Sequence, residues 1–497
     1  MAGNINHESG KLGCLRFSAE HRLTMFFHVR DDLPGPVAPP FPPGLCFGVW
    51  ALALQCPGVS HNRNMRKAGR CSILISKFSC RRKILDGMTF FLPSRLGKVS
   101  AMIPLAVLAG GLMVGSPARA GNRVVAWGAG TITNAADNND FGQSVVPVGL
   151  TNAVCVAGGW RHALALKADG TLQGWGDDEL GQTDFAATNN YEAIACGYLH
   201  SLALQTNGWV VATGDDSFGQ TQVPGNLSNV VAVACGFYHS LALQSNGRVT
   251  AWGTSTNSAV IFSDDGVDYG QSVVPAGLTN VVAIAGGGWH SLALKADGTV
   301  AGWGDVQFGQ ADIPPGMSNV VAIAAGAADS LVLKADGTLV DWGDNTYGQT
   351  NIPPGLSNVV AIASGGWHHL ALKSNGTVAA WGAGVGADTN VDFGQSSIPA
   401  GLTNVVRIAA GSVNSLALVG AGPPVLKVPL TVVGLKTNGF TGSLPTENGR
   451  VYQLESVNSL TNPVWSAFPL QAGSGGTLRF NDPTPTGAQR FYRVNRW

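Results

Sequence analysis

Five histidines occupy the same position in copies of one repeated segment, and histidine is the side chain best suited to bind metal or carry protons near neutral pH. They are His162, His200, His239, His290 and His368, and two further copies hold Asp329 and Asn414 at this position. To bind one ion, several of these side chains would have to come within about 2.1 Å of it. Copies spaced around a ring hold equivalent atoms too far apart, so we expect each histidine to hydrogen-bond backbone in a neighbouring turn.

A tryptophan followed by glycine recurs in the same segments. The tryptophans are Trp127, Trp175, Trp252, Trp303, Trp342 and Trp381, and one copy has Thr213 instead. A large aromatic side chain at one place in every copy fills the space between packed sheets. We therefore expect these rings in the core, and we expect the copy with Thr213 to be the least well packed.

Motifs of the common enzyme classes are missing from the sequence. There is no nucleophile elbow, no phosphate-binding P-loop and no His-Glu-x-x-His zinc motif. The alternating Gly382, Gly384 and Gly386 fall in a loop insertion and not at a strand-to-helix turn. The sequence therefore predicts a protein that is not an enzyme, with no catalytic residue, no cofactor and no metal site.

The repeated landmarks divide residues 121–422 into seven units. A Gly-Gln pair recurs at Gly142, Gly181, Gly219, Gly270, Gly309, Gly348 and Gly394. Each unit divides into four short segments, which we call strands A to D, with D after Gly-Gln. Pairs such as Asp297-Gly298 join B to C and favour two-residue hairpin turns. Four strands repeated seven times predict an all-β fold, a seven-bladed β-propeller.

The two ends of this region complement each other. The last unit, Val405 to Val419, contains strands A and B only, whereas Arg123 to Trp127 forms a strand C without its own A or B. We expect the N-terminal strand to complete the last blade, because closing the ring removes exposed sheet edges.

The repeat resembles a known family. The Trp-Gly pair with Gly-Gln following, and the segment Gly-x-x-His-Ser-Leu-Ala-Leu, resemble the regulator of chromosome condensation repeat family. The repeats are similar to those of secreted bacterial members, including the propeller-type protein inhibitor of β-lactamase. The resemblance implies seven blades and a role in binding a protein or another ligand, and it does not name the partner.

The regions flanking the propeller differ from it. Residues 88–120 have the features of a secretory signal peptide: Arg95 and Lys98, an apolar run, and a small-x-small cleavage site ending at Ala120. We expect the mature protein to be secreted or held at the cell surface, without a membrane span. Residues 1–87 are interpreted as an over-extended N-terminus without a domain, with translation starting at Met88. Residues 425–497 alternate apolar and polar side chains and predict a small β-sandwich module.

Charge is unevenly distributed although the net charge is zero. Residues 121–424 carry a net charge of −14, against +10 before them and +4 after them. Because phosphate binding requires basic surface, the acidic propeller excludes nucleic acid as the expected partner.

One face of the predicted propeller gathers candidate binding residues. In an antiparallel unit the A–B and C–D turns share a face, which we call the A–B face. Its A–B turns carry aromatic side chains, namely Trp160, Tyr198, Phe237, Tyr238, Trp289 and Trp367. Long C–D insertions on the same face are rich in Asp and Asn, and they suit either calcium binding or simple solvation. We favour solvated loops, because none has the spacing of an EF-hand.

These observations predict an exported binding scaffold that recognises a protein or a surface glycan through the A–B face. One alternative is a hydrolase or lyase that uses the centre of this face. Another is an exchange factor for guanine nucleotides, which the expected export disfavours. The partner and the oligomeric state are left open.

Overall fold

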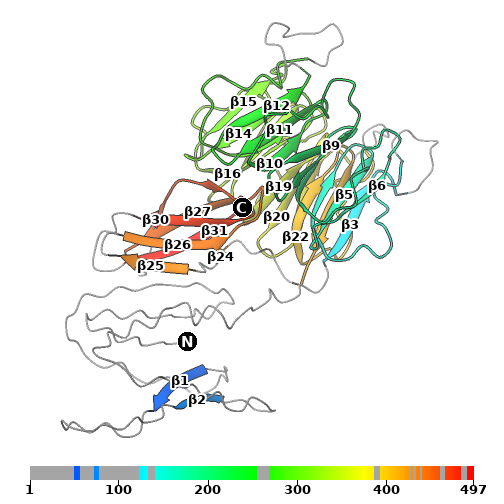
Figure 1. The fold of residues 1–497 in the computed structure, drawn as a ribbon. Helices are drawn as coiled ribbons and strands as arrows, with labels where there is room; N and C mark the ends of the chain where they lie inside the picture. Colours follow the sequence, from blue (N-terminus) through cyan, green and yellow to red (C-terminus); the bar gives the residue numbers. More distant parts are fainter. Residues whose placement is uncertain are drawn as a thin grey trace, which may run out of the picture. The chain divides into compact units, whose positions relative to one another are not determined.

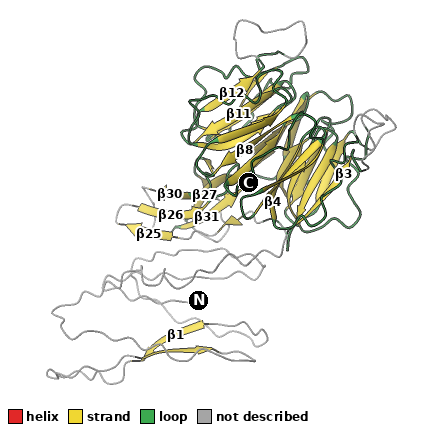
Figure 2. Ribbon diagram, turned by 45° about the vertical axis from the view of Figure 1, so that its right-hand side comes forward, coloured by secondary structure: helices red, strands yellow, loops and turns green. Residues whose placement is uncertain are grey.

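The computed structural model describes residues 50–55, 72–77, 122–131, 140–254, 268–384, 392–421, 424, 427–428, 432–436, 439–458, 465–482 and 490–497. All the regular elements in these ranges are strands (Figure 2). Among the described residues there is no helix of the length and apolar character needed to cross a membrane. The expected signal peptide at 88–120 and the proposed start at Met88 lie outside these ranges, as do most residues of the acidic insertions.

Seven three-stranded antiparallel sheets form the blades (Figure 1). The first three are β4 (Ala153–Gly158), β5 (His162–Lys167), β6 (Leu172–Gly176); β7 (Tyr191–Cys196), β8 (His200–Gln205), β9 (Val210–Gly214); and β10 (Val230–Cys235), β11 (His239–Gln244), β12 (Val249–Gly253). The next three are β13 (Val281–Gly286), β14 (His290–Lys295), β15 (Val300–Gly304); β16 (Val320–Ala325), β17 (Asp329–Lys334), β18 (Leu339–Gly343); and β19 (Val359–Ser364), β20 (His368–Lys373), β21 (Val378–Gly382).

The seventh blade confirms the predicted ring closure. It contains β22 (Val405–Ala410), β23 (Asn414–Val419) and, from the other end of the propeller, β3 (Arg123–Gly128). Strand β3 pairs with β23 over its whole length, with Asn414 opposite Gly128 and Val419 opposite Arg123. The N-terminal strand therefore occupies the place that strand C has in the other blades.

The central strand of each blade, strand B, forms most of the core. Its first five residues are buried in all seven blades, and its two leucines lie on either side of an alanine in six blades and of Val332 in the fifth. Both faces of this strand are covered by neighbouring blades, which explains why its sequence is a continuous apolar run and not an alternating one. The Leu-Ala-Leu run of the repeat is thus the hydrophobic core of the propeller.

The prediction of a fourth strand in each blade was wrong. After Gly-Gln the chain turns, as shown by the bond from Gln222 N to Gly219 O at 3.1 Å, and then runs on without a ladder. This segment contains a proline in most units, such as Pro224 and Pro353, and proline has no N–H to donate to a ladder. The blades therefore end at strand C.

The B–C turns also differ from the prediction. Gly170 N donates to Lys167 O, and Lys167 N donates to Thr171 O, which encloses a three-residue loop. Only the glycine has positive φ, at 81°, while Asp169 accepts a hydrogen bond from Thr171 N. A type I turn followed by a left-handed glycine gives this geometry, so Asp-Gly here marks a bulged hairpin and not a two-residue turn.

The C-terminal module consists of two sheets, as expected of a β-rich segment. One contains β24 (Lys427–Val428), β31 (Phe491–Arg496), β27 (Val451–Val457), β28 (Ser466–Ala467) and β29 (Gln471–Ala472); the other contains β25 (Val432–Lys436), β26 (Gly439–Pro445) and β30 (Thr477–Asp482). Phe440 and Phe480 of one sheet and Tyr452 of the other are fully buried. Before residue 88, β1 (Trp50–Gln55) pairs with β2 (Ser72–Lys77).

Candidate functional site

The recurrent histidines lie at the junctions between blades. In five junctions the histidine Nε2 lies 2.7–3.1 Å from a serine Oγ on strand B of the next blade. The pairs are His162–Ser201, His200–Ser240, His239–Ser291, His290–Ser330 and His368–Ser415. The predicted backbone partner was therefore wrong, because the second residue of strand B, a serine in these five blades, contacts the histidine of the preceding blade.

These histidines are neutral and donate to their serines. Burial lowers the pKa of His162, His239, His290 and His368 to about 3, and that of His200 to about 4. In four junctions the serine Oγ itself donates to the carbonyl of a Gly-Gln glutamine, as Ser291 does to Gln271 O at 3.0 Å. The serine must then accept from Nε2–H, which fixes the tautomer of the ring.

The tryptophans join the same junctions. Each indole Nε1 donates to the main-chain carbonyl of the glutamine in the preceding Gly-Gln pair, at 2.7–3.1 Å. Gln271 O, for example, accepts from both Ser291 and Trp303. Thr213, which replaces tryptophan in one blade, reaches Gln182 O at only 3.4 Å, and its strand β9 has no fully buried residue. The repeat positions are thus structural contacts between blades.

The A–B turns are held to one another by hydrogen bonds. Backbone bonds link neighbouring turns, such as Trp160 N to Tyr198 O at 3.2 Å and Ala327 N to Gly366 O at 3.0 Å. Past the closure point Ser412 N donates to Gly159 O at 3.1 Å, so such bonds link six of the seven neighbouring pairs of turns, all but the second and third. Turns held in this way present their side chains from a rigid base, which lowers the entropy lost on binding a partner.

Five of the six predicted aromatic residues lie in one continuous arc over the first four blades. The Trp160 and Tyr198 rings are stacked, with centroids 4.1 Å apart and planes within 7°. Tyr198 then contacts Phe237 at 5.0 Å, and Phe237 contacts Trp289 at 5.2 Å. Tyr238 lies 5.8 Å from Tyr198. All five side chains are partly exposed, and we call them the aromatic arc.

The sixth predicted residue, Trp367, lies outside this arc. Its ring contacts Tyr347 at 6.3 Å, and the turns on either side of it carry Ala327 and Ser412 in place of aromatics. The A–B turns are therefore divided into an aromatic half and a half in which Trp367 has turns with small side chains on both sides.

Among the described residues, two polar groups in or beside the aromatic arc have no hydrogen-bond partner. Arg161 Nε and Trp289 Nε1 are buried and make no hydrogen bond within the described ranges. The Arg161 guanidinium lies 3.4 Å from the centroid of the Trp160 ring and 4.5 Å from that of Phe141. A buried donor without an acceptor is destabilising, so both groups are suited to an acceptor on a bound partner.

A second set of aromatics on this face escaped the sequence analysis. The residue before each Gly-Gln is aromatic in six of the seven units: Phe141, Phe218, Tyr269, Phe308, Tyr347 and Phe393, with Leu180 in the seventh. Phe218 contacts Tyr238 at 5.2 Å, which confirms that A–B turns and Gly-Gln loops share a face. Phe308 and Leu180 are 53% and 50% exposed, so this set extends the apolar surface outward. The regular position of these aromatics before Gly-Gln was enough to predict them from the sequence.

The centre of the face is a narrow channel. It has a cavity volume of about 60 Å³ and is lined by turn glycines, such as Gly159 and Gly287, with Cys196, Cys235 and Ser364. Pockets for drug-sized ligands are several times larger. Among the described residues that line the channel there is no carboxylate and no histidine.

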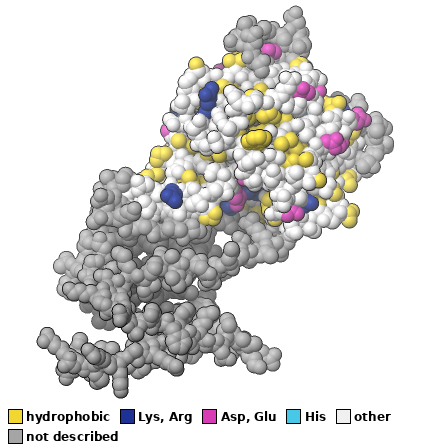
Figure 3. Space-filling view, in the orientation of Figure 1, with side chains coloured by type: hydrophobic (Ala, Val, Ile, Leu, Met, Phe, Trp, Pro, Cys, Tyr) yellow, Lys and Arg dark blue, Asp and Glu magenta, His cyan; other side chains and the backbone are white. Residues whose placement is uncertain are grey.

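In two of the acidic insertions, the last aspartate is described by the structure and accepts a hydrogen bond within its own loop. Asp140 and Asp392 each accept a bond from a backbone N–H at the opposite end of their loop, Gly130 and Gly384 respectively. These two carboxylates therefore close the loops. Asp137, Asp264, Asp265 and Asp388, which belong to the same insertions, lie outside the described ranges. Figure 3 shows charged side chains spread singly over the visible face of the propeller.

Comparison with known proteins agrees with this geometry. A model for the Regulator of chromosome condensation (RCC1) repeat matches residues 153–182, 191–220, 230–258, 281–310, 320–349 and 359–385. These are the six uninterrupted units; the seventh is the one split between the two ends of the propeller. No curated protein sequence matches the chain.

Several solved structures are similar to the chain. Prp20p from Saccharomyces cerevisiae is 20% identical, with 61% of this chain and 93% of Prp20p covered and a TM-score of 0.48. Human WBSCR16 is 21% identical, with 60% and 98% covered and a TM-score of 0.45. The ectodomain of the Physcomitrella patens receptor kinase CR4 is 16% identical, with 57% and 79% covered and a TM-score of 0.41. On the six repeat matches and the seven closed blades, the propeller of this chain is built from repeats of the regulator of chromosome condensation family.

Proposed function

We propose that this protein is an exported, non-enzymatic scaffold that binds a protein partner through the aromatic half of its A–B face. The observation that carries the proposal is the aromatic arc, in which four rings from four successive blades are in contact and partly exposed. Aromatic side chains at the centre of an interface contribute most of the binding energy in many protein complexes.

The polar groups of the arc indicate what the partner offers. Arg161 Nε and Trp289 Nε1 are donors without an acceptor among the described residues, and they lie in turns of the first and fourth blades. A partner surface with apolar side chains flanked by carbonyl or carboxylate oxygens would satisfy both donors. Such charge-assisted bonds to arginine are among the stronger hydrogen bonds in proteins.

A glycan partner is less well supported. Sugar rings stack on the open face of an aromatic ring, but Tyr198 covers one face of Trp160 and the Arg161 guanidinium covers the other. The ring edges of the arc are available to a partner, but both faces of Trp160 are covered. This favours a partner that contributes side chains over one that stacks a sugar ring.

Export is supported by the sequence of residues 88–120 alone, with its basic start, short apolar run and Ala118-Arg119-Ala120. We expect the mature protein to begin at Gly121. Fractionation of the producing cells followed by N-terminal peptide mass spectrometry tests this. A protein retained inside the cell, or a mature product containing peptides from before Met88, would contradict it.

The binding proposal is tested by capture from culture medium and cell-envelope fractions. The baits are the full chain, Trp289→Ala, and Trp209→Ala as the matched control. Trp209 is 65% exposed and follows the B–C turn on the opposite face. We expect one protein to be retained by the wild type and by Trp209→Ala and to be lost with Trp289→Ala. Retention by Trp289→Ala together with loss on Trp209→Ala would place binding on the other face.

A further inference from the structure

One blade junction departs from the repeated chemistry. Five junctions contain a histidine and a serine, but between the fifth and sixth blades Asp329 takes the place of the histidine and His369 that of the serine. The junction between the seventh and first blades has Asn414 and Ala163 at these positions. Both members of the pair have thus changed together in each exceptional junction.

The exceptional fifth junction also contains an additional carboxylate. Asp341 lies opposite Leu331 in the ladder between β17 and β18. Every other blade has glycine or alanine at the equivalent place: Ala126, Gly174, Ala212, Ala251, Gly302 and Ala380. A second carboxyl group has therefore replaced a small residue next to the altered pair.

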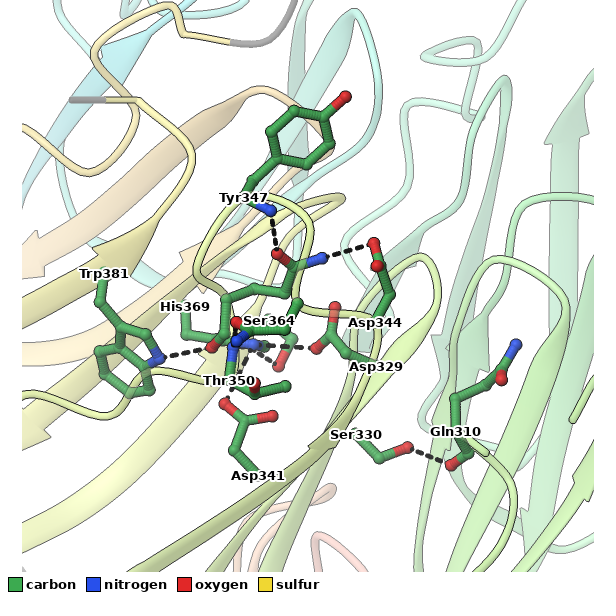
Figure 4. Close-up of polar contacts among 12 residues, drawn as sticks. Gln310, Asp329, Ser330, Asp341, Asp344, Tyr347, Thr350, Ser364, His369 and Trp381 are labelled. Atoms are coloured by element: carbon green, nitrogen blue, oxygen red, sulfur yellow. Dashed lines mark hydrogen bonds and ion pairs between the residues drawn. The ribbon is translucent and has the colours of Figure 1, made fainter. Parts of the chain in front are cut away.

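The three side chains converge on one point in the interior (Figure 4). His369 Nε2 lies 2.9 Å from Asp329 Oδ2 and 3.3 Å from Asp341 Oδ2, and all three side chains have zero exposure. Their donor atoms lie within 4.8 Å of one another. Ligand atoms arranged tetrahedrally around a zinc ion at about 2.0–2.1 Å lie about 3.3 Å apart, close to these separations.

The orientation of the imidazole suits a shared cation better than a simple hydrogen bond. His369 Nε2 and both oxygens of Asp329 make no well-aligned hydrogen bond in the described part of the chain. The nitrogen therefore faces the space between the carboxylates. On the other side of the ring, Nδ1 lies 2.8 Å from Ser364 Oγ. A bond donated by Nδ1 leaves a lone pair on Nε2, which is the form of histidine that coordinates metal.

Charge supports the same conclusion. Two carboxylates in a fully buried site are strongly unfavourable unless protons or cations compensate their charge. Without an ion, protons do so: burial raises the pKa of Asp341 to about 7, and Asp329 and Asp341 raise the pKa of His369 against the effect of burial. A divalent ion would balance both charges. Ser364 also lines the central channel, so the site lies one residue away from solvent-accessible space.

We propose that Asp329, Asp341 and His369 form a structural binding site for a divalent transition-metal ion of the zinc type between the fifth and sixth blades. Imidazole nitrogen and carboxylate oxygen together are ligands of such ions. The complete burial leaves no open position for a substrate, so the ion would join two blades and not catalyse a reaction. The sequence predicted no metal site, because equivalent positions around the ring are too far apart and the neighbours across one junction are not visible in it.

The test compares zinc binding by the full chain and by variants built from the residues of other blades. Asp341→Ala installs the alanine found in four other units, and the double variant Asp329→His with His369→Ser installs the pair found at five junctions. Both are expected to fold, because the alanine and the histidine–serine pair each occur at the equivalent positions of other blades. After removal of metal with a chelator, each protein is dialysed against Zn²⁺, and bound zinc is counted by mass spectrometry of the elements.

We expect the wild type to bind one more zinc ion per chain than either variant, and zinc to raise the melting temperature of the wild type only. Because the wild type and the variants contain the same cysteines, the difference in their zinc content excludes zinc bound by the cysteines before residue 100. Ser364→Ala, an alanine already present at Ala325 and Ala410, is expected to keep the ion and weaken its affinity about 10–100-fold. Equal zinc content in the wild type and the double variant, with no shift in melting temperature, would overturn the proposal.

Discussion

The same seven repeats build the blade junctions and the A–B face. The residues at the junctions are nearly constant from blade to blade, whereas the turn residues on the face vary. At the junctions six tryptophans donate to equivalent glutamine carbonyls, and five histidines pair with equivalent serines. On the face, the residues just before the histidine range from Trp160 and Tyr198 to Ala327 and Ser412. Positions that every blade needs for packing are thus held constant, whereas the adjacent turn positions are free to vary and can specialise in binding.

The largest effect expected from this comparison concerns closure of the ring. Deleting Arg123 to Trp127 removes strand β3 and exposes β23 at an open edge, so we expect the propeller to lose cooperative unfolding. Deleting five residues between Thr254 and Asp268 shortens a connection, which costs little. Thermal melts of both variants measure the difference. Similar melting temperatures would show that the seventh blade does not depend on β3.

A junction tryptophan is expected to have the next largest effect. Trp303 is 7% exposed, and Trp303→Ala removes both a core ring and the bond to Gln271 O. We expect a loss of about 3–5 kcal/mol in the free energy of unfolding, as for other buried aromatics. Urea denaturation provides the value. A loss no larger than that of the face variant Trp289→Ala would remove the distinction between junction and face.

The neutral junction histidines make stability depend on pH. The folded-state pKa of His239 is lowered to about 3, below the ordinary 6.5, so the unfolded chain binds a proton that the folded chain excludes. The stability that the neutral His239 contributes to the fold is complete above pH 6.5. It is lost as the pH falls towards 3, at up to about 1.4 kcal/mol per pH unit.

His239→Asn installs the side chain that Asn414 has at this position. In this variant the free energy of unfolding should fall less steeply with decreasing pH, by up to about 1.4 kcal/mol per pH unit. Urea midpoints at pH 7, 6, 5 and 4 provide the comparison. Removing the bond to Ser291 should also lower stability at pH 7 by about 1–3 kcal/mol. An unchanged pH dependence would mean that His239 is not buried as a neutral group.

Trp367 is expected to show the smallest effect. It lies apart from the arc, so Trp367→Ala should weaken partner binding less than Trp289→Ala does. A titration of each variant with the captured partner gives the ratio of dissociation constants. An equal loss for both tryptophans would extend the binding surface over the half of the face with small side chains.

The sequence predicted the features that repetition makes visible and missed those that depend on contacts between repeats. Seven units, the closure by Arg123 to Trp127 and the aromatic turns follow from counting landmarks along the chain. The pairing of His239 with Ser291 spans 52 residues, and no local pattern indicates which serine a histidine contacts.

The same limitation explains the other differences. Asp329 was visible as an exception to the histidine series, but its relation to His369 and Asp341 appears only when two blades are packed together. The predicted fourth strand failed because a proline-containing segment can extend without pairing. By contrast, the aromatic residue before Gly-Gln was available in the sequence and was overlooked.

The most direct test of the account is to measure binding and stability together for three tryptophan variants. For Trp289→Ala we expect the dissociation constant for the captured partner to rise about 30-fold, corresponding to about 2 kcal/mol, with little change in the free energy of unfolding. Trp209→Ala should change neither quantity, and Trp303→Ala should reduce stability. Unchanged partner affinity in Trp289→Ala, together with weakened affinity in Trp209→Ala, would contradict the assignment of the aromatic arc as the binding surface.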